Sequence, residues 1–150
     1  MLYLRKATPA DIDLIYEWAN DPVVRSASFN TAPIPYEDHK KWYDGVMRRD
    51  DVQLFVLMDD ESPAGQIRLN IDGDEAEISY SISAAFRGKG YGRKMLRLMT
   101  ETIRSDYREI NTLIAKVKPE NAASKALFEG EGYETEYICY SYGFDSCRCK

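Results

Sequence analysis

The sequence predicts one α+β domain over residues 1–150, with a mixed, mostly antiparallel sheet of six to seven strands and four flanking helices. A length of 150 residues suits a single domain. Apolar residues alternate along the middle of the chain, as they do in half-buried strands. Apolar residues at helical spacing occur on both sides of that region, so strands and helices share one chain in a mixed order.

The first third of the chain is expected to hold one strand and two helices. Residues 2–6 form a short apolar run that is typical of a strand. Thr8 is a suitable N-cap for a helix that continues to Ala19, because apolar residues follow it three and four apart. Residues 23–35 contain two prolines and are expected to form a loop, and residues 36–48 a second helix.

The middle of the chain predicts an antiparallel meander. Residues 53–58, 64–71 and 75–82 have the apolar runs or alternation of strands. The turn at Asp72-Gly73 suits a hairpin, because Asp-Gly supplies the positive φ that tight turns need.

The last third alternates helices with strands. A helix over residues 91–105 is expected to follow a glycine-rich turn, and a strand over 112–117 to follow that helix. A short helix over 121–129 then leads to a final edge strand over 134–142. Because such a strand could pair across a dimer, the chain is expected to be a monomer or a homodimer.

Charge and cysteine content argue against several classes of function. The net charge of −5 disfavours nucleic acid as the main partner. No apolar run reaches 18 residues and the N-terminus lacks a signal-like segment, so we expect no membrane span and a cytoplasmic location. Cys139, Cys147 and Cys149 are expected to be reduced thiols, and no metal site is expected.

The strongest local signal is a glycine-rich turn between a strand and a helix. Glycines let several backbone N–H groups converge at a helix N-terminus, where the dipole favours an anion. The spacing fits neither a dinucleotide fold nor a P-loop, so a coenzyme A loop and a turn without a ligand remain. The residues of this turn are Arg87, Gly88, Lys89, Gly90, Tyr91 and Gly92.

Two motifs together resemble the GNAT superfamily of N-acetyltransferases. The turn over residues 87–92 matches that family's Arg/Gln-x-x-Gly-x-Gly/Ala pyrophosphate loop. Residues 121–133 are similar to its second motif, with an Asn, a Ser three residues on, a Leu-aromatic pair and a Gly-aromatic ending. The resemblance implies the GNAT fold and acetyl-CoA as the acetyl donor.

The resemblance also implies which residues hold the donor. Backbone N–H groups of residues 87–92 would bind the pyrophosphate, and main-chain groups of the preceding strand would pair with the pantetheine. The remaining implied contacts are Ile82 and Ala84 for the pantetheine, and Asn121, Ser124 and Lys125 for its far side.

Acetyl transfer to an amine needs a proton acceptor and can use an acid for the leaving thiolate. By the resemblance, an N–H near Ile82 would stabilise the oxyanion. Phe128 stands where many family members carry an acidic Tyr, so Tyr133 or Tyr80 could replace it. Glu77 is the candidate base, acting through water. Each tyrosine could equally be packed, Glu77 solvated, and the thiolate could leave without an acid.

Residues 17–29 and 34–42 contain a Trp-x-Asn-Asp sequence, an Arg after Pro-x-Val, and a His-x-x-Trp sequence. By these features the region resembles the branch of the family that acetylates UDP-linked 4-amino sugars in the pseudaminic acid pathway. The acceptor would then be a small amine on a nucleotide-linked sugar. A cation would bind its phosphates and an aromatic plane its uracil, although each such residue could instead be structural. The expected acceptor residues are Trp18, Arg25, Phe29, His39, Trp42 and Tyr80.

Two other functions remain open at this point. A protein N-terminal acetyltransferase is one, because an acidic groove suits a basic peptide. A non-catalytic coenzyme A-binding regulatory module is the other, because Phe128 cannot donate a proton.

Overall fold

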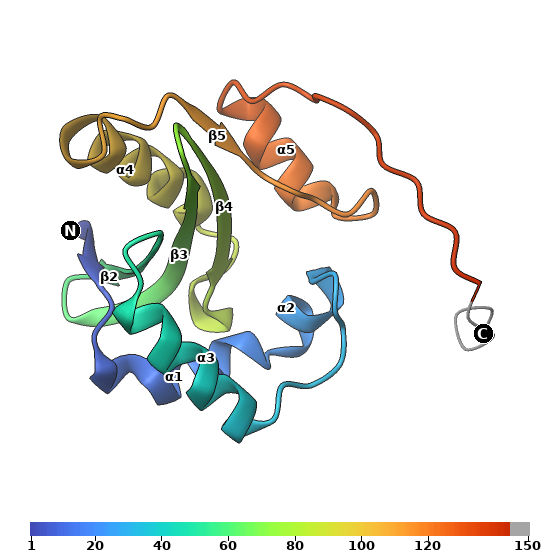
Figure 1. The fold of residues 1–150 in the computed structure, drawn as a ribbon. Coiled ribbons are helices and arrows are strands. Elements are labelled where there is room, and N and C mark those ends of the chain that lie inside the picture. Colours follow the sequence, from blue (N-terminus) through green and yellow to red (C-terminus); the bar gives the residue numbers. More distant parts are fainter. Residues whose placement is uncertain (145–150) are drawn as a thin grey trace.

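A computed structural model describes residues 1–144 and contains a five-stranded sheet in which strand order follows sequence order (Figure 1). The first four strands pair antiparallel, and the fifth pairs parallel to the fourth. The strands are β1 (Leu2–Lys6), β2 (Val52–Asp59), β3 (Ser62–Asp72), β4 (Glu75–Ile82) and β5 (Thr112–Ile114).

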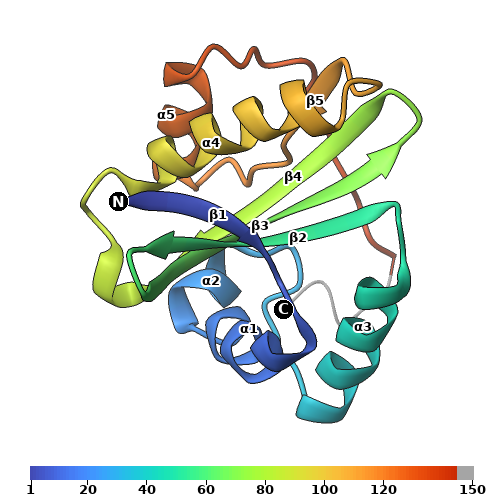
Figure 2. The ribbon, with the colours of Figure 1, turned by 90° about the vertical axis from the view of Figure 1, so that its left-hand side faces the viewer.

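Five α-helices cover the two faces of this sheet (Figure 2). One face carries α1 (Ile12–Ala19), α2 (Pro22–Ala27) and α3 (Tyr36–Arg48). The other carries α4 (Tyr91–Asp106) and α5 (Ala122–Gly130). Short 3-10 turns precede α1 and the α4 loop, at Pro9–Asp11 and Ala84–Phe86.

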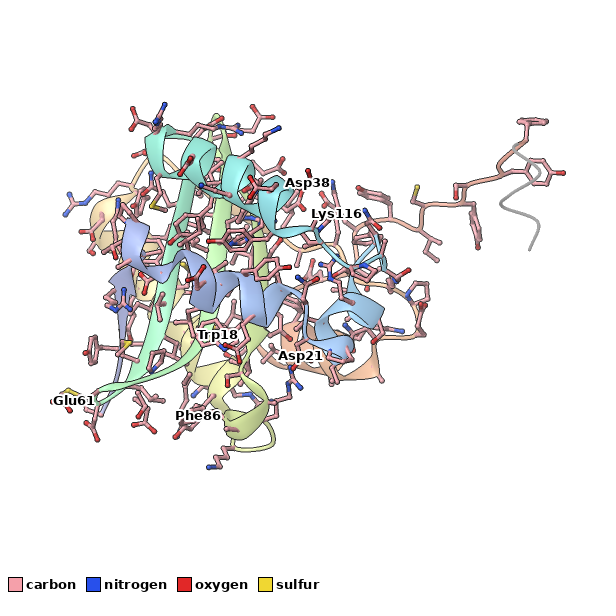
Figure 3. The ribbon with its side chains drawn as sticks, turned by 90° about the horizontal axis from the view of Figure 1, so that it is seen from below. Trp18, Asp21, Asp38, Glu61, Phe86 and Lys116 are labelled. Atoms are coloured by element: carbon pink, nitrogen blue, oxygen red, sulfur yellow. The ribbon has the colours of Figure 1, made fainter. Side chains whose placement is uncertain are left out.

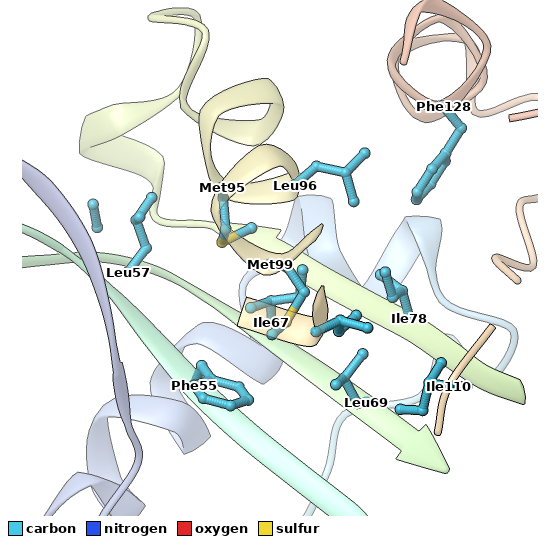
Figure 4. Close-up of a cluster of buried hydrophobic side chains, with 13 residues drawn as sticks. Phe55, Leu57, Ile67, Leu69, Ile78, Met95, Leu96, Met99, Ile110 and Phe128 are labelled. Carbon is cyan, nitrogen blue, oxygen red and sulfur yellow. The ribbon is translucent and has the colours of Figure 1, made fainter. Parts of the chain in front are cut away.

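The core is divided between the two faces of the sheet. Thirteen buried residues pack between the sheet and the α4–α5 layer (Figure 4), and eight pack beneath α1 and α3. The larger cluster includes Ile67, Leu69, Met95, Met99 and Phe128. This division follows from strand alternation, which sends successive side chains to opposite faces.

The start of α1 is anchored to β1 by a nearly buried ion pair. The Asp11 carboxylate accepts hydrogen bonds from both terminal nitrogens of Arg5 at 2.8 and 2.9 Å. It also accepts from the backbone N–H of Thr8 at 2.8 Å, which completes a capping box. The Arg5 guanidinium and the Thr8 N–H hold the pKa of Asp11 below its ordinary value.

The sheet opens between β4 and β5. Their pairing covers only three residues and ends at Glu77, whereas β4 continues to Ile82. The Ser83 N–H donates to the Ala64 carbonyl oxygen at 2.8 Å. In an antiparallel ladder the adjacent residue then turns its N–H and C=O the other way. The backbone of Ile82 therefore faces the opening.

The α+β fold class is confirmed, but the elements differ in three places from those predicted. The structure has five strands within residues 1–144 and not six to seven, because residues 134–142 form no strand. In addition, β5 ends at Ile114 and not at residue 117. An additional helix, α2, lies in the expected loop. Asp21 and Pro22 end α1 and also begin α2, since the Asp21 side chain accepts from the Val23 N–H at 2.9 Å.

Candidate active site

The glycine-rich loop forms an open cradle at the start of α4. Gly88 and Gly90 have φ values of 78° and 77°, and Gly90 is the N-cap of this 16-residue helix. A Cβ built on either glycine meets no atom within 4 Å. The space beside both glycines is therefore open, at a helix end whose unpaired backbone N–H groups favour an anion.

Positive charge surrounds the loop. Arg93 pairs with Glu131 at 3.0 Å and is engaged within the protein. Lys89 and Lys94 have no carboxylate partner among residues 1–144; their amines lie over neighbouring aromatic rings at 5.5 and 5.6 Å. These two ammonium groups are placed to neutralise phosphate charge.

Arg87 connects this loop with both the open edge of β4 and α2. Its Nε donates to the Ile82 carbonyl oxygen at 3.1 Å, and its Nη2 lies 3.1 Å from the Asp21 carboxylate. A pantetheine pairing with Ile82 would compete with the first of these bonds. Arg87 thus connects the expected donor site with α2, which lies on the face of the sheet where the acceptor is expected.

The residues expected on the far side of the donor lie at the start of α5. The Asn121 side chain caps α5 by accepting from the Ser124 N–H at 3.1 Å. The Ser124 hydroxyl lies 2.8 Å from the hydroxyl of Tyr80. Lys125 is exposed. Tyr80, which was expected as an acceptor residue or as an alternative acid, therefore lies on the α5 side beside the expected donor contacts.

The two catalytic candidates have different surroundings. Glu77 lies on the opposite face of β4 from Tyr80 and pairs with Lys116 at 3.1 Å. The Tyr133 hydroxyl is buried and has no hydrogen-bond partner within residues 1–144. Burial raises the pKa of Tyr133 to about 12. Its ring contacts Phe128 of α5, with ring centroids 5.0 Å apart.

Two of the expected acceptor residues belong to the core. Trp18 is buried beneath α1. His39 is only 2% exposed, and its Nε2 lies 2.8 Å from the Ile12 carbonyl oxygen. Neither side chain presents a surface for a ligand in this structure, whereas Phe29 is largely exposed.

Arg25 organises the chain after α2. Its guanidinium donates to three carbonyl oxygens, those of Ala19, Asn30 and Ala32, at 2.7 to 3.2 Å. It also donates to the Ser28 hydroxyl at 3.1 Å. Four of its five possible donor interactions are thus formed within the protein, which leaves little capacity for a phosphate.

Trp42 forms part of a feature that sequence reasoning missed. The Arg68 guanidinium lies 5.3 Å from the centre of the Trp42 ring, on the face of the sheet that carries α3. Arg68 forms no ion pair within residues 1–144; burial lowers its pKa, and the charge of Glu77 partly opposes that shift. The alternation of residues 64–71 predicts that the Arg68 side chain lies on the other face of the strand from Ile67 and Leu69. Its contact with Trp42 depends on how α3 packs against the sheet.

A second missed feature is the anchoring of α2 at both ends. Asp21 pairs with Arg87 after β4, and the Ser26 carbonyl oxygen accepts from Lys118 after β5 at 3.1 Å. Figure 3 shows Asp21 at the start of α2. Because its partners follow the two strands that separate, α2 bridges the opening between them.

An acidic cavity of about 470 Å³ lies near the N-terminal end of β4, away from Ile82. Arg49 pairs with Asp51 and Lys116 with Glu77, so Asp72 and Glu75 remain without a cation partner within residues 1–144. The lining residues are Arg49, Asp51, Asn70, Ile71, Asp72, Glu75, Glu77, Ile114 and Lys116.

Residues 1–134 match the sequence model of the acetyltransferase (GNAT) domain family. The chain belongs to this family. A GNAT acetyltransferase takes its acetyl group from acetyl-CoA, and the space beside Gly88 and Gly90 at the start of α4 is open. The protein is therefore an acetyl-CoA-dependent N-acetyltransferase; the residues that contact donor and acceptor remain predictions.

Solved structures share the fold of this GNAT domain. The aminoglycoside acetyltransferase AAC(6')-Ib, bound to coenzyme A, is 22% identical with a TM-score of 0.78, covering 91% of this chain and 86% of that one. A spermidine N-acetyltransferase from Vibrio cholerae, bound to CoA and spermine, is 20% identical with a TM-score of 0.84, covering 96% and 88%. A domain from Methanocaldococcus jannaschii is 21% identical with a TM-score of 0.78, covering 91% and 90%. No curated protein matches the sequence.

None of the helices within residues 1–144 is long and apolar enough to cross a membrane. No group of three or more His, Cys, Asp or Glu side chains in this part of the chain could hold a metal ion.

Proposed function

We propose that this GNAT acetyltransferase acetylates an amino group on a nucleotide-linked sugar, the acceptor of the enzyme branch that residues 17–29 and 34–42 resemble. The observation that carries the proposal is the Arg68–Trp42 pair on the α3 face of the sheet. A guanidinium without a carboxylate partner suits a phosphate, and a partly exposed indole beside it suits a uracil ring.

The position of this pair fits the size of the acceptor. Arg68 pairs in register with Ser79 of β4, three residues before Ile82. At about 3.4 Å per residue, Arg68 lies about 10 Å along the strands from the edge that faces the donor. That separation is suitable for a sugar between its phosphate and the amine that reacts.

Arg25 and His39 are not assigned to the phosphates of the nucleotide-linked sugar. Both were expected to bind phosphate, but Arg25 is bonded to carbonyl oxygens of its own loop and His39 is buried. We assign both to shaping the acceptor side, and Arg68 to the phosphate.

The reaction forms a C–N bond as the acceptor amine attacks the acetyl carbonyl, and the thiol leaves as the C–S bond breaks. Acetyl-CoA supplies the activated thioester. We assign the N–H of Ile82 to the carbonyl oxygen, because it faces the opening of the sheet. This N–H would stabilise the negative charge that develops during attack.

Proton transfer is assigned to water in this proposal. Glu77 lies five residues from Ile82, about 17 Å along an extended strand, so it can accept the amine proton only through several waters. Tyr133, with its pKa of about 12 and its buried hydroxyl, is poorly suited to protonate the thiolate. The thiolate would then leave without a side-chain acid.

A second acceptor class is favoured by the acidic cavity. Asp72 and Glu75 could hold a distal ammonium group of a polyamine or an aminoglycoside, while another amine reaches the donor. The aminoglycoside acetyltransferase with a similar fold has been solved with kanamycin bound, and the spermidine N-acetyltransferase with spermine. An acceptor of this class would need to span about 24 Å along β4, because Glu75 lies seven residues before Ile82.

The test is thiol release from acetyl-CoA with four acceptors side by side: a UDP-4-amino-sugar, spermidine, kanamycin and an N-terminal peptide. Two variants separate the acceptor classes, Arg68→Gln and the double variant Asp72→Asn/Glu75→Gln. Asp44→Asn, at an exposed position of α3, is the matched control.

Turnover with the UDP-sugar, and a KM for it that rises about tenfold in Arg68→Gln only, would support the proposal. Turnover confined to spermidine or kanamycin, with KM raised only in the double variant, would replace it with the polycationic acceptor. Turnover confined to the peptide would overturn both.

A further inference from the structure

Gly65 of β3 lies at a point where no side chain fits. A Cβ built on this glycine would lie 2.6 Å from the backbone oxygen of Ser81 in β4, and real Cβ atoms essentially never lie within 3.0 Å of another atom. The same Cβ would lie 3.3 Å from the Cα of Ile82. The two strands therefore approach each other more closely here than any residue with a side chain at position 65 allows.

A β-bulge directly precedes Gly65. Ala64 has no partner on β2, because the residues on either side of it pair with consecutive residues of that strand. A bulge bends its strand and increases the local twist. On the other side of β3, the Ala64 carbonyl oxygen accepts from the Ser83 N–H at 2.8 Å, directly after the end of β4. The bend in β3 is thus passed to the last residues of β4.

These contacts hold the part of β4 that borders the opening of the sheet. The pairing of β4 with β3 continues to Ile82, which lies opposite Gly65, whereas its pairing with β5 ends at Glu77 (Figure 1). The residues of this last pair do not bond to each other, because the hydrogen bond is made by the adjacent pair, Ala64 and Ser83. The N–H of Ile82 therefore points away from β3 and toward the opening.

We propose that Gly65 is a positioning residue for acetyl transfer. Because it has no side chain, β4 comes close enough to β3 to place the Ile82 N–H where the acetyl carbonyl oxygen would lie. Gly65 acts through Ile82 and contacts neither donor nor acceptor, since β4 lies between β3 and the opening. The inference rests on the assignment of the Ile82 N–H in the proposed function, but on no particular acceptor.

The shift that a side chain would force is large for a reacting site. In Gly65→Ala, the distance between the new Cβ and the Ser81 oxygen must grow from 2.6 Å to 3.0 Å or more. The displaced oxygen belongs to the backbone one residue before Ile82, so a change of side-chain rotamer cannot relieve the contact. A misplacement of about 1 Å can cost about 100-fold in rate. A shift of a few tenths of an ångström should therefore cost about tenfold.

A matched variant separates positioning from a general loss of stability. Ile67 is the next residue of β3 on the same face as Gly65, and its side chain is fully buried in the larger core cluster (Figure 4). Ile67→Val removes a buried methyl group, so it should also destabilise the protein. It leaves the spacing between β3 and β4 unchanged, because it adds no atom between the strands.

The first test is calorimetric binding of coenzyme A and of adenosine 3′,5′-bisphosphate, which is the nucleotide part of coenzyme A without its pantetheine. In Gly65→Ala, we expect the Kd for coenzyme A to rise about five- to tenfold, because the displaced edge of β4 loses its bonds to the pantetheine. The Kd for adenosine 3′,5′-bisphosphate should stay within about twofold, and Ile67→Val should change neither value. Equal losses for both ligands in Gly65→Ala would show general damage and overturn the proposal. This test needs no acceptor, so it stands even if the sugar is not the acceptor.

The second test is kcat at saturating acetyl-CoA, with whichever acceptor supports turnover by the wild-type protein. We expect kcat to fall about tenfold in Gly65→Ala while the acceptor KM stays within about twofold. Ile67→Val, with a comparable loss of thermal stability, should keep the wild-type kcat. A wild-type kcat in Gly65→Ala would overturn the proposal for any acceptor.

Ser83→Pro provides the same test if Gly65→Ala does not fold. The φ of Ser83 is −57°, which proline adopts without strain. Proline removes the N–H that bonds to Ala64 and places a ring carbon against that carbonyl oxygen, so it separates the end of β4 from β3 at a partly exposed position. We expect the same losses of kcat and of coenzyme A affinity, with adenosine 3′,5′-bisphosphate bound as before. A folded Ser83→Pro protein with wild-type kcat and affinity would show that the proposal is wrong.

Discussion

The two faces of the sheet offer different kinds of group to their expected ligands. The α4–α5 face has the larger core and offers backbone N–H groups, at Gly88, Gly90 and the edge of β4. The α1–α3 face offers polar side chains, and several of these are used to hold the protein together. Donor binding should therefore depend on backbone conformation, and acceptor binding on side chains and on the loop that Arg25 holds.

The largest effect should come from the backbone of the donor face. In Gly90→Val, a β-branched side chain must adopt a φ of 77° at the mouth of the cradle. We expect acetyl-CoA affinity to fall about 100-fold by calorimetry, which is about 2.7 kcal/mol. Gly45→Ala, in open space within α3, should leave affinity unchanged. Unchanged affinity in Gly90→Val would remove the cradle from the donor site.

Arg25→Ala should produce the largest effect on the acceptor face. Losing the bonds to three carbonyl oxygens releases the loop after α2, so we expect acceptor KM to rise about tenfold or more and stability to fall by about 1–3 kcal/mol. The Kd for acetyl-CoA should stay within about twofold. Arg48→Ala, at the exposed end of α3, is the control. An equal loss of donor affinity would show that the faces are not separate.

Asp21→Asn should sharpen the boundary between the two faces. Asparagine keeps the N-cap of α2, but it loses the charge that pairs with Arg87. We expect acceptor KM to change about three- to fivefold in steady-state kinetics, with a smaller change for acetyl-CoA. Asp38→Asn, in the exposed first turn of α3, should change neither value. A change in donor affinity alone would place Asp21 in the donor site.

Asp11→Asn should have the smallest effect on activity, because Asp11 supports the fold far from the opening of the sheet. The lowered pKa of Asp11 means that its ion pair stabilises the protein above the ordinary value of 3.8. That stabilisation disappears as pH falls through the lowered pKa. We expect Asp11→Asn to lose about 1–3 kcal/mol at pH 7 in urea unfolding, and the difference to shrink below about pH 3.8. A difference independent of pH would contradict this assignment.

Much of the fold was predictable because its signals are local. Apolar periods of two and of 3.6 placed β2, β3, β4 and the longer helices near their observed positions. The exceptions come from short segments. Asp21-Pro22 suits both a helix end and a helix start, and β5 keeps only three paired residues because β4 turns away from it.

The sequence by itself determined the fold class and the glycine-rich loop at the start of α4, because glycine spacing and helix starts act through the backbone of adjacent residues. Only the tertiary structure decided the acceptor side. It turned Arg25 and His39 toward the protein, brought Arg68 beneath Trp42, and joined α2 to both separated strands. A long polar side chain takes its partner from whatever the packing brings near, and its own sequence neighbours do not specify that partner.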